Sequence, residues 1–275
     1  MALVLGLLSA IGPFAIDMYL PALPTIGSTL GASIGEVQAS LMVFFVALGL
    51  GQVIYGPLSD MFGRKLPLYA GLVMFMVASV GCALAPNIQA LVAWRFVQGL
   101  GACVGMVIPR AVVRDLHTGP EAAKLMAQLM LVFSVSPILA PLTGSFLIEA
   151  FGWRSVFWAV LLAAALGVAL MARGLPETRP AHERVSSSVA GALSAYGLLL
   201  RDRHFLGLVF IGSFSMASFF SYLANSSFVL IDHYGLSPRQ YSVVFAANAA
   251  SFIGVSQFAG PLAKRFGLPR VVRFG

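Results

Sequence analysis

The chain has 275 residues, of which 59% are hydrophobic and only 10% are charged. An ordinary soluble domain carries about 25% charged residues, so this composition excludes a water-soluble globule. A net charge of +7 would suggest nucleic-acid binding in a soluble protein. Here the basic residues lie in short gaps between long apolar runs, and this placement indicates membrane topology instead.

Eight apolar runs are long enough to cross a bilayer as helices, which requires about 20 mostly apolar residues each. In chain order the runs cover residues 2–23, 37–59, 66–85, 90–108, 125–148, 155–172, 205–231 and 241–262. We interpret the first run as a retained helix, because it lacks the basic leader and the cleavage site of a signal peptide. The sequence therefore predicts an all-α, polytopic membrane protein.

The Lys and Arg residues between these runs predict the orientation, since cytoplasmic loops are enriched in them. With Met1 in the cytoplasm, fourteen Lys and Arg residues fall in inside loops, and only Arg154 and Arg239 fall in outside gaps. If the assignment had one helix more or fewer, every later loop would change sides and this bias would disappear. We therefore expect a multi-pass protein with a cytoplasmic N-terminus.

The first and fourth runs each contain one interior charged residue, Asp17 and Arg95. A charge at the centre of a membrane helix costs about 2.5 to 3.5 kcal/mol on insertion scales, so it persists mainly where it has a partner or a function. Both residues lie on the order of 10 Å below the outer surface, and we expect them to face one cavity. We predict that Asp17 carries the coupling proton and that Arg95 assists, the alternatives being a permanent ion pair or a snorkelling arginine.

A turn with the sequence GPLSDMFGRK follows the second run. Gly56 and Gly63 would allow close helix approach, while Asp60, Arg64 and Lys65 place charge at the helix ends. A plain glycine-rich turn anchored by positive charge is the alternative. The turn recurs as GPLAKRFGLP at an offset of 204 residues, and two related halves are typical of secondary transporters, whose substrate site lies between the repeats.

This repeat divides the chain into two halves. Residues 1–173 are predicted to form an N-terminal six-helix bundle, residues 174–203 a cytoplasmic linker rich in Pro, Ser and charge, and residues 204–275 a partial C-terminal bundle of two helices and the start of a third. A second half equal to the first would need six helices, but residues 204–275 provide only two and the start of a third. We therefore expect a truncated or partial reading frame.

The fifth and seventh runs carry further candidate residues. Pro137, Pro141 and Gly144 would bend the fifth helix and admit a close neighbour, so we expect a packing pivot there, with an incidental kink as the alternative. The seventh run mixes aromatic rings with amide and hydroxyl groups, which suits a pocket for amphipathic organic compounds, although aromatic stripes also serve helix packing. The candidate substrate-binding residues are Tyr19, Tyr222, Asn225, Phe228 and Asn248.

The sequence contains no phosphate-binding loop, no Ser/His/Asp arrangement and no metal-ligand spacing. We therefore expect neither an enzyme nor a bound metal or organic cofactor.

Taken together, the motifs resemble the Bcr/CflA subfamily of drug:proton antiporters in the major facilitator superfamily. The resemblance rests on PFAIDMYLPALP, GPLSDMFGRK, RFVQGLGACVG, SPILAPLTGS and the segment from SYLANSSFVLIDHYGLSPRQY to FAAN. It implies the major facilitator fold, with a proton-coupling role for Asp17 and for the fourth-helix motif of Arg95, Gln98 and Gly99. It also implies an inner-loop gating motif made by Gly56, Asp60, Gly63, Arg64 and Lys65.

The sequence departs from the family pattern in two places. Pro137, Pro141 and Gly144 correspond to the antiporter motif of the fifth helix, but Ala140 and Ser145 stand where the family usually has glycine. In the family the inner-loop motif engages a helix of the second half that would lie beyond residue 275. We therefore expect Asp60 to lack a partner in this chain.

By this resemblance the protein is expected to export drugs or other small amphipathic compounds across the bacterial inner membrane in exchange for protons. It would act as a monomer, with its substrate, protons and the lipid bilayer as partners, without nucleic acid and with the proton gradient in place of a cofactor. A proton symporter for uptake of a small organic solute and a non-transporting membrane remnant are the alternatives. Missing helices would supply half of the cavity wall, which would leave a lone chain inactive.

Overall fold

The computed structural model describes residues 1–184, 189–267 and 270, and every regular element in that part of the chain is helical. Eight helical segments are long and apolar enough to cross a membrane, which confirms the predicted fold class. In chain order they are α1 with η1 and α2 (Ala2–Asp17, Leu20–Ala22, Leu23–Leu30), α3 (Ile34–Phe62), α4 (Lys65–Ala83), α5 (Ile88–Leu116), α6 (Gly119–Phe151), α7 (Ser155–Gly174), α9 with η3 (Arg203–Ser227, Phe228–His233), and α10 with α11 (Pro238–Ser256, Ala259–Phe266).

Several helices extend beyond the apolar runs that predicted them. Helix α3 continues through Pro57 to Phe62, and α5 continues past residue 108 to Leu116. Charged residues at the end of an apolar run can remain helical where the helix projects from the hydrocarbon layer. Arg110 and Arg114, which the sequence analysis assigned to an inside loop, therefore lie within α5.

Glycines in α5 let neighbouring helices approach closely. A Cβ atom added at Gly99 would lie 2.4 Å from the backbone oxygen of Phe44 in α3. One added at Gly105 would lie 2.3 Å from the backbone oxygen of Leu8 in α1. Small residues at helix crossings are the usual way for membrane helices to pack. The RFVQGLGACVG motif thus packs α5 closely against α1 and α3.

The first membrane span, Ala2–Leu30, has a break in its α-helical hydrogen bonding directly after Asp17, where α1 ends. Pro21 has no N–H to donate to the carbonyl of Asp17, and Pro24 has none for the carbonyl of Leu20, so two helical hydrogen bonds cannot form. The chain passes through the short turn η1 into α2. The break leaves Asp17 at a helix end inside the bundle, where it is 6% exposed.

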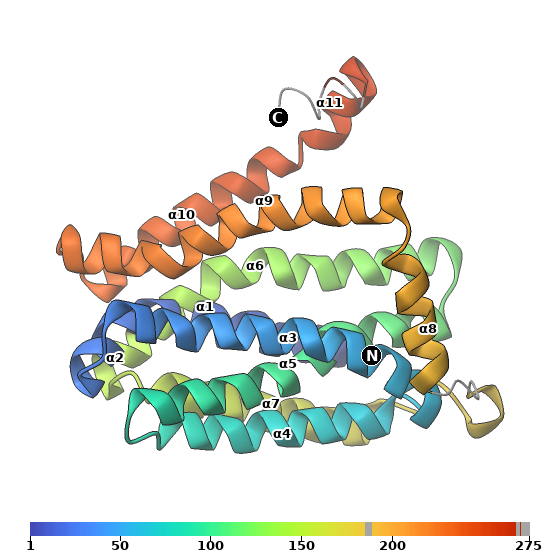
Figure 1. The fold of residues 1–275 in the computed structure, drawn as a ribbon, viewed down its shortest axis with the longest axis horizontal. Helices are drawn as coiled ribbons and strands as arrows, with labels where there is room; N and C mark the ends of the chain where they lie inside the picture. Colours follow the sequence, from blue (N-terminus) through green and yellow to red (C-terminus); the bar gives the residue numbers. More distant parts are fainter. Residues whose placement is uncertain (185–188, 268–269, 271–275) are drawn as a thin grey trace.

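Helices α9 and α10 contact the first six spans at the end where this break lies. Ser242 of α10 donates to the carbonyl of Pro141 in α6 at 2.8 Å, and Gln38 of α3 donates to the side-chain oxygen of Asn225 in α9 at 3.0 Å. Farther along, α10 diverges from α6 and leads to α11 (Figure 1). The two parts of the chain therefore meet at one end of the spans and separate toward the other.

The predicted linker at residues 174–203 contains a helix that the sequence analysis did not predict. This helix, α8 (Val189–Leu199), follows the short turn η2 (Ala181–Glu183) and crosses the ends of the spans (Figure 1). Tyr196 of α8 donates to the carbonyl of Val53 in α3 at 2.9 Å. Residues 185–188 of the linker and 271–275, where a ninth membrane helix was predicted to begin, lie outside the described residues.

The internal repeat has a counterpart in the backbone. Gly63 and Gly267 occupy equivalent positions of the repeat and both adopt left-handed conformations, with φ of 88° and 83°. Glycine is favoured there because it has no Cβ atom. The two copies of the motif thus end their helices in the same way.

Candidate functional site

Asp17 lies against α6. Its Oδ2 atom accepts a hydrogen bond of 3.0 Å from the hydroxyl of Ser136. The break after α1 and Gly144 of α6 make this contact possible, since a Cβ atom at Gly144 would lie only 2.6 Å from the backbone oxygen of Met18. The carboxylate is therefore held at the junction between a helix end and a closely packed neighbour.

Arg95 is fully buried in an aromatic cage. Its guanidinium carbon lies 4.4 Å from the ring centroid of Tyr19 and 4.1 Å from that of Phe44. Its Nη1 atom donates to Gln98 at 2.7 Å and to the carbonyl of Ala15 at 3.3 Å. The Nε and Nη2 atoms are buried and have no hydrogen-bond partner among the described residues. Charge–ring contacts thus replace part of the hydration that the cation loses.

Asp17 and Arg95 do not pair in this structure. Among the described residues, no ion pair joins the two side chains. Asp17 contacts α6, whereas Arg95 contacts the backbone of α1 and a ring of α3. The permanent ion pair considered from the sequence is therefore absent here, and the two residues do not share the cavity described below.

Gln98, predicted from the fourth-helix motif, positions Arg95. Its side-chain oxygen accepts from Arg95, and its nitrogen donates to the hydroxyl of Ser79 in α4 at 2.8 Å. The fourth-helix motif therefore forms one buried hydrogen-bonded chain from α1 through α5 to α4.

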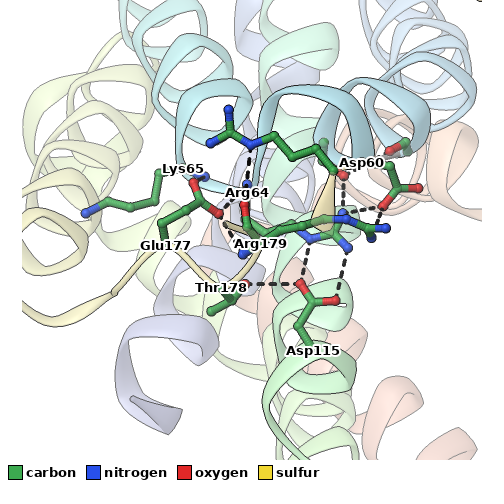
Figure 2. A network of polar contacts seen from close by, with 10 residues as sticks. Asp60, Arg64, Lys65, Asp115, Glu177, Thr178 and Arg179 are labelled. Atoms are coloured by element: carbon green, nitrogen blue, oxygen red, sulfur yellow. Dashed lines mark hydrogen bonds and ion pairs between the residues drawn. The ribbon is translucent and has the colours of Figure 1, made fainter. Parts of the chain in front are cut away.

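Arg64 is the centre of a charged network at the end of the spans where α3 meets α4 (Figure 2). Its Nη1 atom donates to Asp60 and to Ser59 at 2.7 Å each. Its Nε and Nη2 atoms donate to the two carboxylate oxygens of Asp115 at 2.7 and 3.1 Å. Such a two-pronged contact with a carboxylate is a geometry that arginine favours. It ties the inner-loop motif to the end of α5.

The segment after α7 completes this network. Glu177 accepts hydrogen bonds from the backbone N–H groups of Arg64 and Lys65 at 2.8 and 3.1 Å. Arg179 donates to Asp60 at 2.8 Å, and the hydroxyl of Thr178 donates to Asp115 at 3.1 Å. Residues 177–179 therefore close over the inner-loop motif (Figure 2).

Two expectations about the inner-loop motif are wrong. Asp60 was expected to lack a partner, yet it forms ion pairs with both Arg64 and Arg179. Gly56 was expected to allow close helix approach, yet a Cβ atom there would meet nothing within 4 Å. A Cβ atom at Gly63 would lie 2.8 Å from a carboxylate oxygen of Glu177, so the close neighbour there is the segment after α7 and not a helix.

The network shifts the pKa values of Glu177 and Arg64, two of its members that lie outside the membrane spans. Burial would raise the pKa of Glu177, but three backbone N–H donors hold it below its usual range. Burial would likewise lower the pKa of Arg64, but the hydrogen bonds and charges of Asp115 and Asp60 raise it above its usual value. Both groups are therefore charged at neutral pH.

Helix α6 bends where prolines interrupt it. Pro137 and Pro141 lie inside the helix, and each removes one backbone hydrogen bond. The carbonyl of Pro141 accepts a hydrogen bond from Ser242 of α10. Gly144 packs closely against the backbone of Met18, which follows Asp17. The predicted packing pivot thus contacts both halves of the chain.

A cavity of about 630 Å³ lies between α6, α9 and α10. Its volume is in the range of small-molecule sites. Asn248 donates to the hydroxyl of Tyr222 at 2.9 Å across it. Its other lining residues include Phe133, Ser134 and Pro137 of α6, Phe219 of α9, and Phe245 and Phe252 of α10.

Only part of the predicted substrate-binding set lies in this cavity. Tyr222 and Asn248 line it. Tyr19 instead covers Arg95 and shares a 2.6 Å hydrogen bond with Ser40. Asn225 contacts Gln38 at the interface of α3 and α9, and Phe228 is buried in the core.

Sequence reasoning missed several residues. Glu177 and Arg179 were treated as part of a polar linker, and nothing in their local sequence indicates a partner more than a hundred residues away. Arg110 was counted as a loop cation, yet it lies within α5 with its guanidinium carbon 5.3 Å from the ring centroid of Phe133. Its position two residues beyond an apolar run was the only available signal.

The family described as Major Facilitator Superfamily matches residues 5–275. An uncharacterized MFS-type transporter of Bacillus subtilis, YdgK, is 40% identical over 97% of this chain and 66% of its own length. A bicyclomycin resistance protein homologue of Haemophilus influenzae is 31% identical over 96% of this chain and 65% of its own length. The chain thus spans slightly less than two thirds of these relatives.

Solved structures share the fold. A bacterial homologue of the human lysosomal transporter Spinster superposes with a TM-score of 0.72 at 18% identity, covering 98% of this chain and 63% of that protein.

Proposed function

We propose that this chain, which belongs to the Major Facilitator Superfamily, takes part in exporting small amphipathic compounds across a bacterial inner membrane in exchange for protons. The name of the Haemophilus relative, a bicyclomycin resistance protein homologue, supports export of a toxic compound. Because the chain spans 66% and 65% of the relatives' lengths, their whole activity is carried over only as part of this proposal.

The observation that carries the proposal is the hydrogen bond from Ser136 to Asp17. An unpaired carboxylate inside a membrane span is costly and is most often part of an ion or proton pathway. Ser136 lies on α6, the same helix that forms one wall of the cavity. One helix therefore contacts both the candidate proton carrier and the candidate substrate site.

This arrangement supports a role for α6 in coupling proton transfer at Asp17 to changes in the cavity. Met130, Phe133, Ser134 and Pro137 follow each other at helical spacing and line the cavity, while Ser136 faces α1. Gain or loss of a proton at Asp17 would change its hydrogen bond with Ser136. The bend at Pro137 and Pro141 would then shift the cavity wall, as in a rocking motion of one bundle against the other.

The charged network at the α3–α4 turn supports a gating role for the inner-loop motif. It joins α3, α5 and the segment after α7 into one unit through Asp60, Asp115 and Glu177. A unit tied in this way would move as a rigid body during rocking. We further propose that this end faces the cytoplasm, because the Lys and Arg residues outside the spans concentrate there.

The test is transport by the purified chain in proteoliposomes with an acidic lumen. For an antiporter, an uncharged compound should accumulate in the lumen as protons leave, and a protonophore should abolish this accumulation. Protein-free liposomes control for passive trapping. Movement of the compound out of the acidic lumen together with protons would indicate a symporter instead. If the gradient moves none of a panel that includes bicyclomycin, the proposal that this chain exports such compounds is wrong.

A further inference from the structure

The walls of the cavity between α6, α9 and α10 carry no charged side chain among the described residues. We propose that this cavity accepts uncharged aromatic compounds that carry hydrogen-bonding groups and rejects organic cations, and that Arg110 is the residue responsible for the rejection. This inference rests on the proposed function only in treating the cavity as the place where an exported compound binds.

Five of the twelve described residues that line the cavity are aromatic. The rings of Tyr222 and Phe245 stack with centroids 5.7 Å apart and an interplanar angle of 14°. Phe219 and Phe252 stack at 6.5 Å and 26°. Parallel, offset rings present flat apolar faces, and a planar ligand ring can stack on them. The cavity therefore favours a flat aromatic group.

The polar groups of the cavity are uncharged. Asn248 donates one N–H to Tyr222, which leaves its amide oxygen, its second N–H and the tyrosine hydroxyl hydrogen for a ligand. These groups can satisfy a carbonyl, an amide or a hydroxyl. They offer a cation no negative charge, so a cation that stacked on the rings would meet the positive charge of Arg110 with no anionic partner to offset it.

Arg110 supplies positive charge beside the cavity. Its guanidinium carbon lies 5.3 Å from the ring centroid of Phe133, which lines the cavity. Its Nε atom is buried without a hydrogen-bond partner, and no ion pair neutralises the side chain among the described residues. The charge of Arg110 is therefore not cancelled locally.

The carboxylate that would attract a cation lies on the other side of α6. Asp17 contacts Ser136, which faces α1, whereas the neighbouring residues Ser134 and Pro137 face the cavity. Asp17 itself is not among the residues that line the cavity. A bound cation would thus experience Arg110 without direct contact with Asp17. At a separation of about 10 Å and an effective dielectric constant of about 20, this repulsion would weaken cation binding about 15-fold.

The test compares two fluorescent probes of the same ring system on the purified chain in detergent micelles. Dansylamide is uncharged at pH 7, and a dansylamidoethyl-trimethylammonium probe carries one positive charge. Dansylamide should bind at least about tenfold more tightly. In Arg110→Gln the affinities should converge to within about threefold, while Arg110→Lys should keep the discrimination. Equal or tighter binding of the cation by the unaltered chain would overturn the proposal, as would an unchanged ratio in Arg110→Gln.

Two further variants locate the binding. Asn248→Ala should weaken dansylamide binding several-fold, because it removes the hydrogen-bonding amide. Ile211→Ala, on an exposed face of α9, should leave it unchanged. If Asn248→Ala has no effect, the probe binds elsewhere and the assignment to this cavity is wrong. These measurements need no proton gradient, so failed transport would refute the proposed function without altering them.

Discussion

The hydroxyl of Ser136 donates to Oδ2 of Asp17 at 3.0 Å, and this bond joins the end of α1 to the middle of α6. The two residues are 119 positions apart in the sequence. Their contact depends on two local features, the proline-induced break after Asp17 and the missing side chain at Gly144. It holds the one acidic residue within the first span against α6, the helix that also lines the cavity.

Replacing Asp17 by Asn should abolish transport driven by a pH gradient, because the amide keeps the size and the hydrogen bond but cannot release a proton. The measurement is accumulation of an uncharged compound in proteoliposomes with an acidic lumen. Asp232→Asn, a change of an exposed acid in η3, is the matched control and should transport normally. Undiminished pH-driven transport by the Asp17 variant would remove Asp17 from the mechanism.

Arg95→Lys should destabilise the protein by about 1 to 3 kcal/mol despite keeping the charge. A lysine cannot present a flat face to the rings of Tyr19 and Phe44, and it cannot reproduce the donor geometry toward Gln98. Thermal unfolding in detergent measures the loss. Arg201→Lys, at an exposed position between α8 and α9, should unfold at the unaltered temperature. An unchanged melting temperature for Arg95→Lys would mean that the cage does not stabilise the cation.

Much of the fold could be predicted from the sequence, because long apolar runs have few stable alternatives to helices in a bilayer. The ends of the helices could not, since α5 stays helical through Arg110 and Arg114. Helix α8 was also missed, because its apolar run of 11 residues is too short to cross a bilayer and directly follows a stretch rich in Pro, Ser and charge. Local composition does not record which charged segments find partners in the folded chain.

The candidate site was predicted unevenly for a related reason. Asp17 and Arg95 were found because charge inside an apolar run is conspicuous. Tyr222 and Asn248 lie in one cavity, but Asn225, only three residues from Tyr222, points to α3 instead. Composition indicates that a helix has polar groups, whereas the direction of each side chain depends on how the helix is rotated against its neighbours.

Gly144→Ala should destabilise the protein by about 1 to 3 kcal/mol. The added Cβ atom would lie 2.6 Å from the backbone oxygen of Met18, and backbone atoms cannot move aside as a flexible side chain can. Gly49→Ala makes the same change in α3, where a Cβ atom meets nothing within 4 Å. This control should be neutral or stabilising, because alanine favours helices. Equal melting temperatures for the two variants would contradict the close approach of α6 to the break.

Glu177→Gln should reduce stability at pH 7 by less than about 1 kcal/mol, since the carboxylate is partly exposed. The pKa of Glu177 lies below its usual value of about 4.3, because three backbone N–H donors outweigh the effect of burial. Its contribution is therefore present above about pH 4.3 and is lost as pH falls through the lowered pKa. Melting temperatures of the two proteins should converge between about pH 5 and pH 3. An equal difference at both ends of this range would argue against a charged contact.

The ion pair of Asp60 with Arg179 should be weak but measurable. Asp60 is 40% exposed and Arg179 22% exposed, so a double-mutant cycle of Asp60→Asn and Arg179→Gln should give a coupling of about 0.5 kcal/mol. The coupling should decrease at 1 M salt, where exposed charges are screened within about 3 Å. Asp60→Asn alone should cost more than Arg179→Gln alone, because it also removes the contact with Arg64. A coupling of zero at low salt would mean that the segment after α7 is held by Glu177 and Thr178 without help from Asp60.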